Sequence, residues 1–295
     1  MSASNTTLGS MTVDATHTIG VVGSGIMAAG IAEVAARGGI RAIVRARSES
    51  SAAAALKQIT GGLARQVDKG KLEASERDRI LTNISTTVDL TGLADCDIVI
   101  ESVVEDLATK QQLFGELDSI VKPSAILATN TSTLSVVDMA KVTNRPDKVC
   151  GIHFFNPAAV LPLVEIVRPI TASDETIARA AAFVTSIGKE GVHVLDRAGF
   201  IVNALLFPYL NNAIRMLEDG TASMQDIDTA MKGGCNFPMG PFALLDLVGL
   251  DTSLSILETL HTSFGDENFV ARPMLRDLVA QGRLGRKTKA GFYVY

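Results

Sequence analysis

A histidine and a glutamate twelve residues apart form the first pair in this sequence that could carry acid–base chemistry. His153 lies near the end of one apolar run and Glu165 lies within the next. Pro157 and Pro162 interrupt the interval, which predicts a tight reversal that sets the two side chains opposite each other on paired strands. A carboxylate beside an imidazole fixes its tautomer and stabilises the imidazolium, so His153 could act as a general base. The alternative is an ordinary structural or surface pair.

A glycine-rich segment, GSGIMA at residues 23–28, could bind the phosphates of a dinucleotide. It follows an apolar run and opens a helical pattern, as such a site requires. Its first glycine permits a tight turn, its second lets the backbone approach a pyrophosphate, and the helix N-terminus offers N–H groups. We therefore expect Gly23, Gly25, Ile26 and Met27 to bind the cofactor, the alternative being a plain turn between strand and helix.

The end of the second predicted strand bears on the choice of cofactor. An acidic residue is expected there to bind the ribose hydroxyls of NAD, but the position holds Arg45, with Arg47 and Ser48 just after it. A guanidinium can donate paired, charge-assisted hydrogen bonds to a 2′-phosphate. NADP(H) is therefore favoured and NAD(H) is the alternative. Both arginines could instead be solvated loop residues.

Alternating strand-like and helical runs predict the frame that holds these residues. Residues 26–37 read as a helix, and residues 48–81 as a helical excursion interrupted at Gly61-Gly62 and around Gly70. We expect an α/β fold with a Rossmann-type, mostly parallel sheet. The strand-like runs are residues 17–23, 41–45, 98–102, 125–129, 150–155, 163–167 and 192–195.

The pattern changes after the last of these runs. From Gly199 onward, long apolar-periodic stretches predict an all-helical C-terminal domain, with only residues 291–295 strand-like. We therefore expect a flexible tail at residues 1–16, a dinucleotide-binding domain at 17–197, and a helical domain for substrate binding and dimerisation at 198–295.

Composition excludes several classes of protein. Of 295 residues, 27 are Lys or Arg and 32 are Asp or Glu, a net charge of −5 without long like-charged runs, so nucleic acid is not an expected partner. Three cysteines without a CxxC pair fit a reducing, cytoplasmic location. The sequence has no signal-peptide pattern and no long apolar run, so no membrane association is expected. The four histidines lack metal-ligand spacing, so no metal is expected.

Several longer motifs carry a family resemblance. The chain resembles the short-chain 3-hydroxyacyl-CoA dehydrogenases, including bacterial 3-hydroxybutyryl-CoA dehydrogenases, from about Thr18 to Tyr295. The resemblance implies a homodimer, associated through its helical domain, that interconverts a 3-hydroxyacyl-CoA and a 3-ketoacyl-CoA with a nicotinamide cofactor. The motifs are TNTSTLS at residues 129–135, HFFNP at 153–157, LVEIV at 163–167, GFIVNALLFPYLNNAIRMLEDG at 199–220, FPMGPFALLDLVGLD at 237–251 and GFYVY at 291–295.

The same resemblance assigns roles to single residues. His153 matches the family's base and Glu165 its carboxylate partner. Ser132 matches the hydroxyl that hydrogen-bonds the reacting oxygen, and Asn203 matches an amide that orients the substrate. Since hydride leaves C3 while the hydroxyl loses its proton, such groups must converge on one carbon.

Further positions match the binding of cofactor and coenzyme A. Glu105 and Lys110 match positions on the nicotinamide side, Asn130 lies in the same cleft, and Lys69 matches a basic residue that contacts CoA phosphates. The chain departs from the family pattern where Arg45 replaces an acid, Ala28 a glycine, and Gly62 a hydroxyl side chain.

Two other functions compete with this reading. One is a dehydrogenase of a hydroxyacyl or glyceryl group carried by acyl carrier protein, which would keep the acid–base pair and change the carrier surface. The other is a noncatalytic dinucleotide-binding protein on the same scaffold. The presence of Ser132, His153, Glu165 and Asn203 favours an enzyme.

Overall fold

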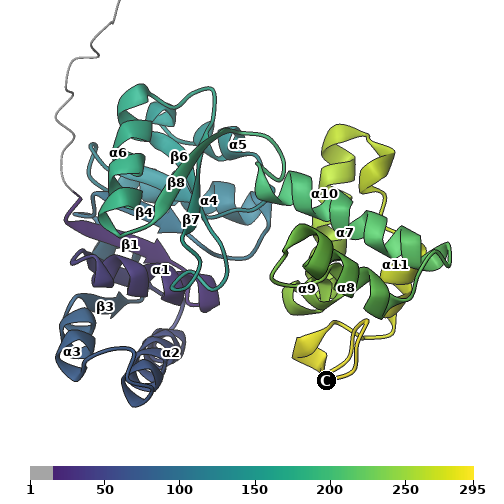
Figure 1. The fold of residues 1–295 in the computed structure, drawn as a ribbon. Coiled ribbons are helices and arrows are strands. Elements are labelled where there is room, and N and C mark those ends of the chain that lie inside the picture. The colour runs from purple at the N-terminus through teal and green to yellow at the C-terminus, as the bar shows by residue number, and fades with distance from the viewer. Residues whose placement is uncertain (1–15) are drawn as a thin grey trace, which may run out of the picture. The chain divides into compact units, whose positions relative to one another are not determined.

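The structure is a computed structural model that describes residues 16–295, so the expected tail lies outside the described residues except for Thr16. Its internal contacts divide it into two compact units (Figure 1). Unit 1 ends at Asp196, and unit 2 runs from Arg197 to Tyr295. Each unit has its own apolar core and is described by itself.

Unit 1 is built on an eight-stranded sheet with the order β3-β2-β1-β4-β5-β6-β7-β8. Every neighbouring pair is parallel except β6 and β7, which are antiparallel, so the expected mostly parallel sheet is confirmed. The order of the first six strands is that of the dinucleotide-binding folds. The strands are β1 (Thr18–Val22), β2 (Arg41–Arg45), β3 (Ile84–Thr87), β4 (Ile98–Glu101), β5 (Ile126–Thr129), β6 (Val149–Phe154), β7 (Leu163–Arg168) and β8 (Glu190–Leu195).

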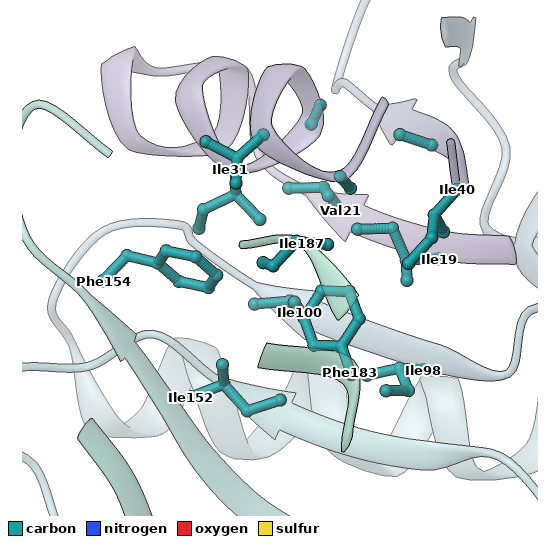
Figure 2. Packing of buried hydrophobic residues seen from close by; sticks show 14 of the residues in the cluster. Ile19, Val21, Ile31, Ile40, Ile98, Ile100, Ile152, Phe154, Phe183 and Ile187 are labelled. Carbon is teal, nitrogen blue, oxygen red and sulfur yellow. The ribbon is translucent and has the colours of Figure 1, made fainter. Parts of the chain in front are cut away.

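Six α-helices complete unit 1. Apolar side chains of the central strands are wholly buried, as in a sheet covered on both faces. Figure 2 shows one layer of this core, where Ile19 and Ile100 from the sheet, Ile31 from α1 and Phe183 from α6 belong to one buried cluster. The helices are α1 (Ile26–Arg37), α2 (Glu49–Asp68), α3 (Ala74–Thr82), α4 (Leu107–Ile120), α5 (Val136–Ala140) and α6 (Asp174–Ser186).

The excursion differs from expectation in two respects. Helix α2 runs without a break through Gly61-Gly62, since buried side chains that include Ile59 and Leu63 pack into the core of unit 1. The expected break near Gly70 is confirmed, because Gly70 adopts a left-handed φ of 64°. Strand β3 was not expected. Its sequence, ISTT, is short and polar, and it forms because it pairs with β2 at the edge of the sheet.

Unit 2 is helical, as expected. A cluster of buried side chains that includes Leu210, Ile214, Leu245 and Leu257 forms its core. The strand expected at residues 291–295 is wrong. Of the described residues, this part of the chain has only isolated bridges at Gly285–Ala290 and Ala290–Val294. The helices are α7 (Val202–Glu218), α8 (Met224–Cys235), α9 (Pro241–Val248), α10 (Leu250–Phe264) and α11 (Pro273–Ala280).

Candidate active site

The antiparallel pairing of β6 and β7 sets His153 directly opposite Glu165, as expected. Nδ1 of His153 lies 2.7 Å from Oε2 of Glu165, a hydrogen-bond distance. The histidine is 5% exposed and the glutamate is fully buried. A buried carboxylate at this distance holds the proton of the neutral imidazole on Nδ1 and stabilises the imidazolium.

Core packing and a hydrogen bond from Phe154 fix the end of β6, the strand that carries His153. Phe154 packs into the core cluster drawn in Figure 2, so His153, one residue earlier, points to the opposite face. The backbone N–H of Phe154 donates to Oδ1 of Asn130 at 2.8 Å, which ties the end of β6 to the segment after β5. The Phe155 ring lies 4.6 Å from the imidazole, ring centre to ring centre.

A lysine fixes the turn between β6 and β7. Nζ of Lys189 donates to the carbonyl oxygens of Ala158 and Leu161 at 2.7 and 2.8 Å. Burial lowers the pKa of this lysine, with Arg37 adding to the effect. The expected reversal of the chain between β6 and β7 is present, and the ammonium group of Lys189 bonds to two carbonyl oxygens within it.

The glycine loop has the shape that a dinucleotide needs. Gly23 has a φ of 135°, and a Cβ there would lie 2.3 Å from the carbonyl oxygen of Ser102, so only glycine fits. At Gly25 a Cβ would meet nothing within 4 Å, which leaves the backbone open to a ligand. Gly25 is the N-cap of α1, so no side chain caps this helix. Its first residue, Ile26, is 63% exposed. Ala28 is buried and small enough for the turn. These residues fit a pyrophosphate.

Arg45 is the last residue of β2 and so lies at the carboxyl end of that strand. Its Nε donates to the carbonyl oxygen of Val88 at 3.2 Å, and the residue is half-buried. Arg47 and Ser48 are exposed, and the Ser48 hydroxyl caps the N-terminus of α2. The guanidinium of Arg45 is therefore anchored beside the loop that precedes α2, and Arg47 extends from the same loop.

Two of the expected nicotinamide-side residues, Lys110 and Glu105, belong to one network of contacts with Glu101, a buried carboxylate that the sequence analysis missed. Lys110 is 1% exposed and lies 2.6 Å from Glu101 and 3.2 Å from Glu105. Glu105 accepts hydrogen bonds from the Thr131 hydroxyl and, at 3.0 Å, from the Ser132 backbone N–H. The signal that could have revealed Glu101 is a single carboxylate within the apolar run 98–102.

Parallel strands place their carboxyl ends at one edge, so several predicted residues gather there. Gly23 follows β1, Glu105 follows β4, Ser132 follows β5, and His153 lies near the end of β6, next to β5 in the sheet. Lys69 is exposed at the C-terminus of α2, Gly62 lies within that helix, Met27 is half-buried in α1, and Asn203 is buried near the start of α7 in unit 2.

Two family profiles together span almost all of the described chain. The profile for the NAD-binding domain of 3-hydroxyacyl-CoA dehydrogenase matches residues 18–197, and the profile for its C-terminal domain matches residues 199–295. They meet at the boundary between units 1 and 2.

Individual relatives agree over nearly the whole length. A 3-hydroxybutyryl-CoA dehydrogenase from Mycobacterium tuberculosis is 45% identical over 284 residues, covering 96% of this chain and 99% of the relative. One from Clostridioides difficile is 42% identical over 277 residues, covering 94% and 99%. The crystal structure of Mycobacterium tuberculosis FadB2 matches with a TM-score of 0.94 and 45% identity, covering 96% of this chain and all of that one. The chain therefore belongs to the 3-hydroxyacyl-CoA dehydrogenase family.

Proposed function

We propose that the chain interconverts a short-chain 3-hydroxyacyl-CoA, such as 3-hydroxybutyryl-CoA, and the corresponding 3-ketoacyl-CoA. The observation that carries the proposal is the buried pair of His153 and Glu165 at the sheet edge where the glycine loop also opens. The relatives named 3-hydroxybutyryl-CoA dehydrogenase support a short acyl chain.

In this proposal each side chain has one task. Nε2 of His153 takes the proton of the 3-hydroxyl during oxidation and returns it during reduction, while Glu165 stabilises the imidazolium. The hydroxyl of Ser132 hydrogen-bonds the reacting oxygen, and the amide of Asn203 orients the substrate. A nicotinamide, when bound, would supply the acceptor or donor of the hydride at C3 of the acyl group.

We infer that the cofactor occupies the glycine loop, with Gly23, Gly25, Ile26 and Met27 against its pyrophosphate. Glu105, Lys110 and Asn130 are assigned to the nicotinamide end. Arg45, with Arg47 beside it, favours NADP(H) over NAD(H), because guanidinium groups attract a 2′-phosphate and cannot accept the bonds that ribose hydroxyls donate. The supporting observation is that Arg45 is anchored beside the loop before α2.

We also propose that the protein is a cytoplasmic homodimer associated through unit 2. Exposed apolar side chains on α7, Leu205 at 72% and Met216 at 44%, support self-association. Its three cysteines are free, which suits a reducing location. Among residues 16–295 no helix is long and apolar enough to cross a membrane.

A steady-state assay with acetoacetyl-CoA and each reduced cofactor tests the proposal. We expect turnover with acetoacetyl-CoA, and higher kcat/KM with NADPH than with NADH. Absence of turnover with both cofactors, in protein that binds a nicotinamide nucleotide, would contradict the substrate assignment.

Binding of the CoA moiety along α2 is tested separately at Lys69. We expect Lys69→Ala to raise the KM for acetoacetyl-CoA about threefold or more at low salt, because one ammonium near a phosphate is worth about a kilocalorie when exposed. Lys57→Ala is the matched control, since Lys57 is also exposed on α2. An unchanged KM in Lys69→Ala would remove this contact from the proposal.

A further inference from the structure

Glu101 is the last residue of the central strand β4 and is completely buried. Burying a carboxylate destabilises a protein unless opposite charge and hydrogen bonds compensate for the lost hydration. The partners of Glu101 therefore indicate which groups it positions. Oε1 accepts from Nζ of Lys110 at 2.6 Å and from the backbone N–H of Val103 at 2.7 Å. Oε2 accepts from the hydroxyl of Thr129 at 2.7 Å.

Two series of hydrogen bonds and ion pairs start at Glu101, one from each carboxylate oxygen. Through Oε1, Lys110 is held where it also lies 3.2 Å from Oε2 of Glu105. Oε1 of Glu105 then accepts from the hydroxyl of Thr131 and from the backbone N–H of Ser132, with the Ser132 hydroxyl at 3.5 Å.

The second series is shorter. The Thr129 hydroxyl that donates to Oε2 of Glu101 also accepts from the backbone N–H of Thr131 at 3.1 Å. Thr131 in turn accepts the backbone N–H of Leu134 at 3.0 Å. Both series that start at Glu101 therefore end on the loop that carries Ser132.

We propose that Glu101 is a positioning residue for Ser132, acting through Lys110 and Glu105 on one side and through Thr129 on the other. The inference rests on the proposed role of Ser132 toward the reacting oxygen. It also gives Lys110 and Glu105 a task besides lining the nicotinamide: they fix the loop from which the hydroxyl is presented. A hydroxyl displaced by a fraction of an ångström loses the alignment that the transition state requires.

The protonation state of Glu105 suits this task. Burial acts to raise its pKa, but Lys110 and the hydrogen bonds from Thr131 and Ser132 outweigh burial and hold the pKa below its ordinary value. Glu105 is therefore ionised at neutral pH and accepts from the loop continuously. Lys110, between two carboxylates, is the only cation among these contacts.

The test compares Glu101→Gln, Thr129→Val and Ser132→Ala in kcat, KM for acetoacetyl-CoA and Kd for the reduced cofactor. We expect the first two variants each to lower kcat about tenfold while the cofactor Kd stays within twofold, because positioning acts on the transition state rather than on cofactor binding. Glu33→Gln is the matched control. It makes the same change at another buried carboxylate that pairs with a cation, Arg37, and touches none of these groups.

A double variant separates positioning from general destabilisation. If Glu101 acts through the hydroxyl of Ser132, then Glu101→Gln in the Ser132→Ala background lowers kcat no further than Ser132→Ala alone. Fully additive losses, or weaker cofactor binding with unchanged kcat, would overturn the inference while leaving the proposed reaction intact. If Glu101→Gln fails to fold, the same comparison is made with Thr129→Val, which removes the hydrogen bond to Oε2 of Glu101. Failure of the wild type to reduce acetoacetyl-CoA contradicts the proposed function instead.

Discussion

His153 is the residue whose replacement should affect turnover most. We expect His153→Gln to lower kcat by at least ~10²-fold, because an amide can still bond to Glu165 but cannot take a proton. Glu165→Gln keeps a hydrogen-bonding group and loses only the charge, so a smaller decrease of about tenfold is expected. His193→Gln, at an exposed histidine on β8, is the control. A folded His153→Gln variant with nearly wild-type kcat would rule out the proton-transfer role.

Arg45 should decide the cofactor. One charged hydrogen bond to a 2′-phosphate is worth roughly 1.5–3 kcal/mol, which corresponds to tenfold or more in kcat/KM for NADPH over NADH. Arg45→Asp should reverse the preference, because a carboxylate repels the phosphate and accepts from ribose hydroxyls. Arg41→Asp makes the same change at the exposed start of the same strand and should leave the ratio unchanged. An NADH preference in the wild type that Arg45→Asp does not alter would show that Arg45 is not the determinant.

At the scale of single residues, the sequence predicted the contact between His153 and Glu165 but not the network of contacts around Glu101. The contact between His153 and Glu165 followed from their spacing and from two prolines, since a reversal between strands fixes which residues face each other. The part played by Glu101 could not be predicted in the same way. Its partners lie 9 and 28 residues away, and only the folded sheet brings Lys110 and Thr129 to its two oxygens.

Among the elements, the start of β1 is held by the carboxylate of Asp97, the residue before β4. Asp97 accepts from the backbone N–H groups of His17 and Thr18 and pairs with Lys122 at 2.6 Å. Burial acts to raise the pKa of Asp97, but Lys122 and the two N–H groups outweigh burial and lower it. The ionised carboxylate is therefore favoured by folding.

The direction of this pKa shift determines a pH dependence. Because the pKa is lower in the folded state, the stabilisation is complete above about pH 4 and disappears as the pH falls through the folded value. We expect Asp97→Asn to lower the free energy of unfolding by about 1–2 kcal/mol at pH 7, and the difference from wild type to shrink below pH 4. Urea unfolding across this range measures it, with Asp95→Asn, an exposed neighbour, as the control. A difference that persists unchanged at pH 2 would contradict the assignment.

Strong apolar patterns predicted elements correctly, whereas the short polar edge strand β3 was not predicted. Helix α1 and strand β2 begin and end where the sequence placed them, because flanking glycines and apolar spacing agree there. Strand β3 has one buried residue, Ile84, and three hydroxyl residues, so nothing in its pattern distinguishes it from a loop. Helix α2 continues through the glycine pair at which a break was predicted, because tertiary packing offsets the helix propensity lost at two glycines.

At the scale of the whole molecule, the two units have separate cores and different ways of closing them. Helices cover the faces of the sheet of unit 1, whereas unit 2 ends in a segment, residues 285–295, that has only one short 3-10 helix and isolated bridges. That segment is fastened by a buried carboxylate in α9. Asp246, 1% exposed, accepts from the backbone N–H groups of Phe292 and Tyr293 at 2.8 Å each and from the Tyr295 hydroxyl at 3.1 Å.

Removing that carboxylate should therefore loosen unit 2 alone. We expect Asp246→Ala to destabilise unit 2 by about 2–4 kcal/mol, because one buried and one half-buried backbone N–H group lose their acceptor and the packing of Phe292 against Phe242 loses its support. Hydrogen exchange should then accelerate across residues 285–295 and α9, while β1 and β4 in unit 1 keep their protection. Asp277→Ala, on α11 and exposed, should change neither region. Equal acceleration in the sheet of unit 1 would mean that the two units do not open independently, which the separate cores of the two units argue against.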